Sequence, residues 1–191
     1  MSAIDVEEKN RIQRPNDCTY WVSPLLLAGE YPGAGTSTAT QQKLGRYLDK
    51  CGIRTFVDLT QNGEKPSYIE LLQEEATKRN CSIHYHRLAI PDFGVPSSHY
   101  TMKKILDTID ASIANGDGVY VHCRGGIGRT GMTVGCWLVR NTHRTGEEAL
   151  IETNRLFRSY SARSRESACS PETQEQMDFV RTWKEDSQIL Q

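Results

Sequence analysis

The chain has 191 residues, of which 37% are hydrophobic and 25% are charged, and its formal net charge is −1 at pH 7. This length suits one domain with a full core, and the near-neutral balance argues against a general surface for nucleic acid or anionic membranes. No apolar run approaches the roughly 18 residues of a membrane-spanning helix, and residues 1–13 do not form a charged-then-apolar signal segment. We therefore expect a cytoplasmic protein with no stable nucleic-acid partner and no membrane span, and composition leaves its oligomeric state open.

The order of predicted elements indicates the fold class. Residues 1–16 are mostly polar and charged, so a flexible segment is expected before a single domain over residues 17–191. Apolar and β-branched runs predict strands over 20–22, 25–28, 53–59, 81–88 and 119–122. Helical spacing of apolar residues predicts helices over 38–50, 67–80, 97–116, 130–140, 145–158 and 170–185. Alternating strands and helices imply an α/β fold with a mainly parallel central sheet flanked by helices on both sides.

Several polar residues can cap these predicted helices. Either Thr38 or Thr40 can begin the first, and either Ser97 or Ser98 can begin the long third one. Thr145 with Glu148 has the spacing of a capping box. The expected starts of the second and last helices are Ser67 and the Ser170–Pro171 pair.

The six cysteines show no Cys-x-x-Cys spacing, so free thiols are expected rather than a disulfide framework. His84 and His86 stand two apart in a predicted strand, which places both on one face. Such a pair is more typical of a polar strand face than of a zinc site. We expect no metal and no cofactor.

The most informative stretch has the sequence GVYVHCRGGIGRTG. Cys123 follows a predicted buried strand, and Gly125, Gly126 and Gly128 lie between it and Arg129. Glycines can adopt positive φ and turn successive backbone N–H groups toward one centre. The N-terminus of the following helix makes the same place favourable for an anion. Arg129 can add a planar two-pronged contact to phosphoryl oxygens. The stretch therefore predicts a cradle for a phosphate dianion.

The same surroundings favour a reactive sulfur. Oriented amides, a helix N-terminus and nearby cations stabilise the thiolate form of a cysteine, so Cys123 is expected to be a nucleophile beside the phosphate site. A buried structural cysteine in a glycine turn is the alternative. A Walker phosphate loop is a poorer match, because the Gly-Lys-Ser/Thr triplet that it needs is absent.

The stretch also follows the pattern Cys-x5-Arg-Ser/Thr, with a histidine before the cysteine, and resembles the cysteine-dependent protein tyrosine phosphatase superfamily. The resemblance implies that His122 helps to hold the thiolate. It also implies that Thr130 eases departure of the Cys123 thiolate when the phosphoenzyme is hydrolysed. Arg124 is expected either to contact acidic substrate or to be merely solvated.

A second stretch, upstream of the cysteine, has the sequence IPDFGVP. It resembles the Trp-Pro-Asp-Phe-Gly-Val-Pro loop of tyrosine-specific phosphatases at every position after the first, where Ile90 replaces tryptophan. The resemblance implies that Asp92 is the general acid, a role that can contribute roughly 10²–10⁴-fold, and that it later activates the hydrolytic water. A simple turn residue is the alternative for Asp92. Because the tryptophan anchors loop movement in the relatives, Ile90 leaves the timing of closure open.

A third stretch, ETQEQMDF, resembles the glutamine loop of tyrosine-specific phosphatases, in which two glutamines place the hydrolytic water. Gln176 matches the second glutamine, whereas Glu172 stands where the first would be. The alternative for Gln176 is a surface residue of the last helix. The expected catalytic residues are Cys123, Arg129, Asp92, Thr130 and His122, and the expected substrate-binding residues are Arg124, Gly125, Gly126, Ile127, Gly128, Phe93 and Gln176.

These features predict a phosphomonoester hydrolase that acts through a cysteinyl-phosphate intermediate on a phosphorylated protein or peptide. Phe93 and the form of the second stretch favour a protein tyrosine phosphatase, while the compact chain resembles the dual-specificity (Tyr/Ser/Thr) group, which is the nearest alternative. An inositol-phosphate, phosphoinositide or RNA 5′-phosphate hydrolase is a further alternative. A non-catalytic phosphoprotein-binding module is the last, and the joint presence of Cys123, Arg129 and Asp92 argues against it.

Overall fold

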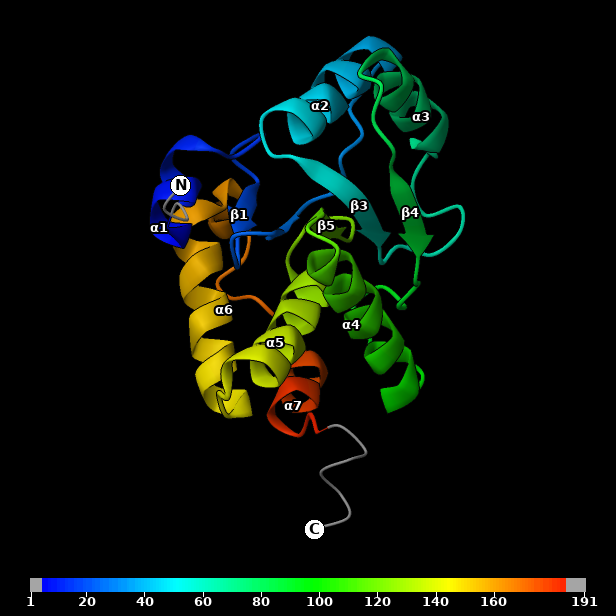
Figure 1. The fold of residues 1–191 in the computed structure, drawn as a ribbon. Coiled ribbons are helices and arrows are strands. Elements are labelled where there is room, and N and C mark those ends of the chain that lie inside the picture. Colours follow the sequence, from blue (N-terminus) through cyan, green and yellow to red (C-terminus); the bar gives the residue numbers. More distant parts are fainter. Residues whose placement is uncertain (1–4, 185–191) are drawn as a thin grey trace.

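The computed structural model describes residues 5–184 of the chain. Figure 1 shows the elements along the chain, which are α1 (Val6–Ile12), β1 (Thr19–Trp21), β2 (Leu26–Gly29), α2 (Ser37–Asp49), β3 (Ile53–Asp58), α3 (Ile69–Lys78), β4 (His84–Arg87), α4 (His99–Ala114), β5 (Gly118–His122), α5 (Gly128–Thr142), α6 (Gly146–Tyr160), a 3₁₀ helix (Ala162–Arg165) and α7 (Gln174–Arg181). Within the described residues, no helix has the length and apolar character needed to cross a membrane.

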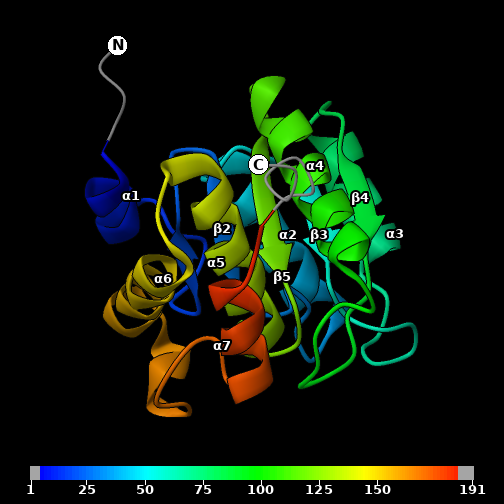
Figure 2. The same ribbon diagram turned by 90° about the horizontal axis from the view of Figure 1, so that it is seen from below.

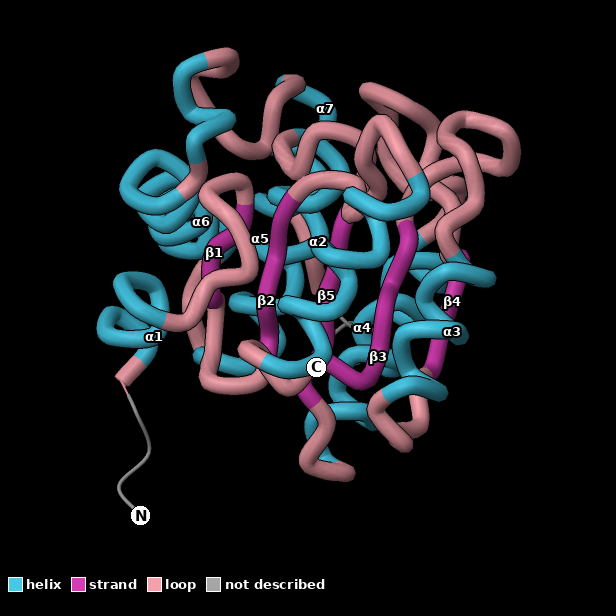
Figure 3. Tube along the Cα trace, turned by 90° about the horizontal axis from the view of Figure 1, so that it is seen from above, coloured by secondary structure: helices cyan, strands magenta, loops and turns pink. Residues whose placement is uncertain are grey.

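The strands form one five-stranded sheet in the order β1-β2-β5-β3-β4. Only the β1–β2 pair is antiparallel; β2–β5, β5–β3 and β3–β4 are parallel, as the alternating pattern predicts. Figure 3 shows β5 in the middle of the sheet, between β2 and β3. Because ligand sites of α/β sheets lie beyond the carboxyl ends of the strands, the residue after β5 occupies the centre of the functional edge.

Both faces of β5 are buried, and alternate residues point into two separate cores. Val119 and Val121 join the core made with α4, α5, α6 and α7, whereas Tyr120 joins the core made with α2 and α3. Figures 1 and 2 show these two groups of helices on opposite sides of the sheet. A strand with two buried faces is apolar without alternation, which is why this short run is rich in valine.

The N-terminal segment differs from the flexible stretch expected for residues 1–16. Residues 6–12 form α1, and Asn10 is fully buried against the edge strand β1. The Asn10 side-chain amide donates to the carbonyl oxygen of Trp21 at 3.0 Å and accepts from the Trp21 N–H at 2.7 Å. One polar side chain thus satisfies both backbone groups of an edge residue, which composition cannot reveal. Residues 1–4 lie outside the described range.

The helix starts test the capping predictions. Ser98 caps α4, and Thr145 with Glu148 forms the predicted capping box of α6. The start of α2 lies earlier than predicted, because Thr36 accepts a hydrogen bond from the N–H of the third residue of the helix. The start of α7 lies later than predicted, because Thr173 caps it rather than the Ser–Pro pair upstream. Ser67 does not cap α3, which has no side-chain cap. The predicted end of the last helix at residue 185 lies outside the described residues.

Candidate active site

The phosphate loop, residues 123–129, connects the end of β5 to the first turn of α5. Its backbone turns back on the cysteine, so that the N–H of Gly126 donates to the Cys123 sulfur at 3.3 Å. Gly126 has φ +71° and packs against the backbone of Gly29, so a Cβ at this position would lie 2.3 Å from the Gly29 carbonyl carbon. Both constraints require glycine. Gly125 and Gly128 do not have positive φ, so only one of the three loop glycines uses that freedom.

A cavity of about 450 Å³ opens over this loop. The sequence-predicted residues on its wall are Asp92, Phe93, Cys123, Arg124, Gly125, Ile127, Gly128, Arg129 and Gln176. Lys65, Arg163, Glu166 and Glu172 complete the wall. The structure therefore brings the phosphate loop, the acid loop (residues 90–96) and the start of α7 to one place, although they are far apart in the sequence.

Arg129 is 2% exposed and is held from two sides. Glu64 binds it through both carboxylate oxygens, with Nη1–Oε2 at 2.8 Å and Nη2–Oε1 at 2.6 Å. Nη1 also donates to the carbonyl oxygen of Ile90 at 3.1 Å. The hydrogen bonds from Arg129 hold the pKa of the Glu64 carboxyl below its usual value. Paired planar hydrogen bonds fix the orientation of a guanidinium as well as its position.

Asp92 lies on the same guanidinium, with its Oδ1 at 2.8 Å from Arg129 Nη2. Its side chain is 37% exposed, and the Arg124 guanidinium lies 4.0 Å from its other oxygen. The neighbouring Phe93 adopts φ +58° and leaves 59% of its surface exposed on the cavity wall. The acid loop thus presents a carboxylate and an aromatic ring to the space above the cysteine.

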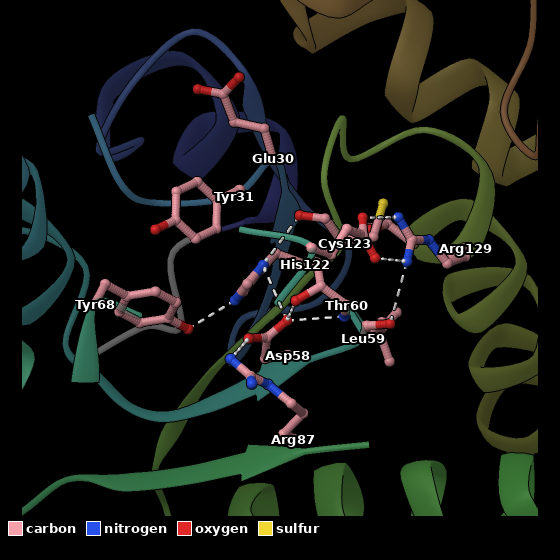
Figure 4. Close-up of polar contacts among 12 residues, drawn as sticks. Glu30, Tyr31, Asp58, Leu59, Thr60, Tyr68, Arg87, His122, Cys123 and Arg129 are labelled. Atoms are coloured by element: carbon pink, nitrogen blue, oxygen red, sulfur yellow. Dashed lines mark hydrogen bonds and ion pairs between the residues drawn. The ribbon is translucent and has the colours of Figure 1, made fainter. Parts of the chain in front are cut away.

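His122 precedes Cys123 at the end of β5 and is fully buried (Figure 4). Its Nδ1 lies 3.1 Å from the carbonyl oxygen of Cys123, and its Nε2 lies 2.7 Å from the hydroxyl of Tyr68. Burial lowers the pKa of His122, so the neutral ring is favoured. A carbonyl can only accept, so Nδ1 carries the hydrogen and Nε2 accepts from Tyr68. Tyr68 therefore selects the tautomer that anchors the backbone of the cysteine.

Asp58, at the end of β3, supports this layer rather than facing the cavity. Its carboxylate accepts from the Thr60 hydroxyl at 2.6 Å and from the Tyr85 hydroxyl at 2.6 Å, and it lies 4.0 Å from His122. Burial opposes ionisation, but His122, Thr60 and Tyr85 outweigh it and keep the pKa of Asp58 below its usual value. Figure 4 shows Asp58, Thr60 and His122 beneath the loop that carries Cys123.

Thr130 and Gln176 are the remaining predicted residues, and both are buried near the cavity. Thr130 is fully buried, with its hydroxyl 3.5 Å from the carbonyl oxygen of Gly29. Gln176 is also fully buried and lines the cavity. Glu172 lies on the cavity wall, where burial and the negative charge of Asp92 raise the pKa of its carboxyl.

All six cysteines are free thiols, as expected. His84 and His86 are exposed on β4, as expected for a polar strand face. Across residues 5–184, no three His, Cys, Asp or Glu side chains are grouped as a metal site would require.

Sequence reasoning missed Glu64 and Tyr68 as parts of the site. Glu64 stands in the loop after β3, whose position at the carboxyl edge of the sheet was a weak signal. No spacing connects Glu64 to Arg129, which is 65 residues away. Tyr68, at the start of α3, contacts His122 across 54 residues.

A family model described as "Polymorphic toxin system, DSP-PTPase phosphatase" matches residues 31–143, more than half of the chain. The chain therefore belongs to this family, within the superfamily of cysteine-dependent tyrosine and dual-specificity phosphatases. The resemblance recognised in the cysteine loop is confirmed.

The chain is similar to the protein tyrosine phosphatase domain-containing protein 1 of Danio rerio, with 29% identity over 140 residues that cover 69% of this chain and 19% of that protein. The Mus musculus protein of the same name is 30% identical over 143 residues, which cover 69% of this chain and 18% of its own length. The chain thus spans less than a fifth of the length of these curated relatives.

Solved structures share the fold. Tk-PTP in its active form superimposes with a TM-score of 0.67 at 22% identity, covering 86% of this chain and 94% of that one. Kinase associated phosphatase, with serine in place of its catalytic cysteine, superimposes with a TM-score of 0.64 at 21% identity, covering 81% of this chain and 83% of that one. These likenesses confirm the α/β architecture with a mostly parallel central sheet.

Proposed function

We propose that the chain hydrolyses phosphomonoesters through a phosphocysteine intermediate, with phosphotyrosine in a protein or peptide as its substrate. The observation that carries this proposal is the meeting of three groups in one cavity. The Cys123 sulfur faces the Gly126 amide, and the Arg129 guanidinium binds the Asp92 carboxylate at 2.8 Å. Nucleophile, anion-holding group and acid are therefore within reach of one phosphoryl group.

In the first step the Cys123 thiolate attacks phosphorus, forming an S–P bond as the P–O bond to the substrate breaks. The loop amides and Arg129 hold the phosphoryl oxygens, and Asp92 gives its proton to the leaving oxygen. In the second step Asp92 takes a proton from water, whose oxygen attacks phosphorus. The S–P bond breaks, inorganic phosphate leaves and the thiolate is regenerated.

The walls of the cavity favour a phenyl phosphate. Phe93 presents an exposed ring beside the acid, and aromatic rings stack in offset or edge-to-face arrangements that suit a tyrosine side chain. The same residues would serve a dual-specificity enzyme, whose alkyl substrates would simply gain less from the ring.

A second candidate is a hydrolase of inositol phosphates or phosphoinositides, because Lys65, Arg124 and Arg163 add positive charge to the cavity wall. Two observations make it the weaker one. Arg163 is already paired with Glu30 at 2.7 Å and with Glu166 at 2.6 Å. Glu166 and Glu172 also line the cavity and would repel a polyanion.

The test is a hydrolysis panel of phosphotyrosine, phosphoserine and phosphothreonine peptides, inositol phosphates and an RNA 5′-triphosphate, each with and without EDTA. The proposal expects the highest kcat/KM on phosphotyrosine peptide and no effect of EDTA. A preference for inositol phosphates would select the second candidate. Activity that EDTA removes and a divalent metal restores would overturn the cysteine mechanism.

A further inference from the structure

The side chain of Gln176 joins three segments that are distant in sequence. At the start of α7, its Oε1 accepts from the backbone N–H groups of Glu172 and Thr173, both at 3.2 Å. Its Nε2 donates to the carbonyl oxygen of Gly94 in the acid loop at 3.1 Å. It also packs on the phosphate loop, because a Cβ built on Gly128 would lie 2.7 Å from Oε1. One buried amide therefore connects α7, the acid loop and the phosphate loop.

The acid loop is held on both sides of Asp92 and is exposed between them. On one side Ile90 is fully buried, and its N–H donates to the carbonyl oxygen of Leu59 at 3.0 Å. On the other side the Gly94 carbonyl accepts from Gln176, and the Thr173 hydroxyl lies 3.4 Å from the Phe93 carbonyl. Removing the contact at Gly94 would leave the longer Thr173–Phe93 contact as the nearest hydrogen bond on this side of Asp92.

Both α6 and α7 begin with a capping box, and comparing the two shows why position 176 carries an amide rather than a carboxylate. In α6 the equivalent residue is Glu148, whose carboxylate accepts from the Thr145 N–H at 2.8 Å. An acceptor is all that a capping box requires of this side chain. In α7 the Oε1 of Gln176 does the same for Thr173. The Nε2 donor, which a carboxylate lacks, has its protein partner in the acid loop.

We propose that Gln176 is a positioning residue for the general acid. Its Nε2–H holds the Gly94 carbonyl, and through it the Asp92 carboxyl, over the phosphate loop. This inference rests on the proposed function, because it needs Asp92 to be the acid. It assigns Gln176 a different task from the placement of hydrolytic water that the resemblance to the glutamine loop implies.

The test compares two substrates with different leaving groups. Gln176→Met removes the donor without adding charge, and Gln176→Glu keeps the capping acceptor and the length but turns an oxygen toward Gly94. With either variant, kcat should fall by about 10-fold to 100-fold on phosphotyrosine, since small misplacements of a catalytic group have such effects. On an aryl phosphate whose phenol is strongly acidic, the fall should be no more than about 3-fold, because that leaving group needs little protonation. Gln174→Met, on the exposed side of the same helix, is the control and should leave both rates at wild-type values.

A double variant separates positioning from other roles. In an Asp92→Asn background, adding Gln176→Met should cause no further loss on phosphotyrosine, because there is no acid left to misplace. Losses that multiply in the double variant, or that are equal on both substrates, would overturn the inference while leaving the proposed function standing. Accumulation of phosphocysteine in Gln176→Met would assign the residue to the water step instead. A wild type inactive on the whole panel would overturn the proposed function and this inference with it.

Discussion

The two walls of the cavity are built in different ways. The wall that carries the proposed nucleophile belongs to the core: Cys123 is 3% exposed and follows the central strand β5, and Arg129 is 2% exposed in the first turn of α5. The opposite wall is a surface loop, in which the Asp92 side chain is 37% exposed and Phe93 is 59% exposed. The core positions Cys123 through many packing contacts, whereas a few hydrogen bonds position Asp92.

This difference has consequences for substitutions. Changes in the buried wall should remove the chemistry on every substrate and should cost stability where a buried partner is lost. Changes in the loop should affect only the steps in which a proton moves, and should leave the fold intact.

Cys123→Ser should reduce turnover on every substrate by about 10⁴-fold or more, because a serine hydroxyl in this loop is not ionised and is a far weaker nucleophile than a thiolate. Binding of inorganic phosphate should persist, since the amides and Arg129 are unchanged. Steady-state kinetics with phosphate inhibition or calorimetry measures both. Cys81→Ser, remote from the cavity, is the control, and residual wild-type turnover in Cys123→Ser would show that the nucleophile lies elsewhere.

Arg129→Lys should lower kcat/KM by about 10²-fold to 10³-fold on both phosphotyrosine and an activated aryl phosphate. An ammonium cannot reproduce the planar fork that binds both oxygens of Glu64 and the carboxylate of Asp92. Arg155→Lys replaces an arginine in a surface ion pair with Glu152 and should have no effect. Near-normal rates for Arg129→Lys would remove Arg129 from the phosphoryl site.

Asp92→Asn should slow hydrolysis of phosphotyrosine by about 10²-fold, because its phenol, with a pKa of about 10, leaves poorly without a proton. An aryl phosphate with a much more acidic phenol should lose far less. If both substrates lose activity equally, the acid is another group, and Glu172, whose carboxyl lies on the cavity wall, is the next residue to substitute.

Glu64→Gln should lower the free energy of unfolding by about 1 to 2 kcal/mol at pH 7, because one of its two hydrogen bonds to buried Arg129 is lost. The pKa of Glu64 is lowered in the folded protein from 4.5 by Arg129, so this stability is present above pH 4.5 and is lost as the pH falls through the folded value. Denaturant titrations at several pH values should show the difference from wild type shrinking below pH 4.5. A difference that does not change with pH would mean that the ionised pair contributes nothing.

Tyr68→Phe should have the smallest effect, a loss of about 1 kcal/mol in unfolding free energy and a several-fold fall in kcat. The variant leaves the buried Nε2 of His122 without its donor at 2.7 Å but keeps the ring packing. Nitrogen chemical shifts of the His122 ring would report the tautomer directly. Unchanged shifts and rates would show that the backbone alone orients His122.

The sequence by itself determined the local features of this protein. The histidine, the cysteine, the arginine six residues further and the following threonine lie along one strand, one loop and one helix turn, so their spacing alone predicts their arrangement. The capping box of Thr145 and Glu148 is local in the same way, and the structure contains it. The apolar run of β5 indicated a strand buried on both faces, which a central parallel strand must be.

Only the tertiary structure decided which distant polar side chains complete the site. Glu64 binds Arg129, which is 65 residues away, and Gln176 donates to Gly94, which is 82 residues away. At the edge of the sheet, Asn10 donates to the Trp21 carbonyl. Ile90, which replaces the tryptophan, is fully buried, and on the other side of Asp92 the Gly94 carbonyl accepts a hydrogen bond from Gln176. These contacts are single pairs with no periodicity. A lone Glu, Gln or Asn in a polar stretch has the same local pattern whether it is solvated or buried, and only the packing of the whole chain makes the difference.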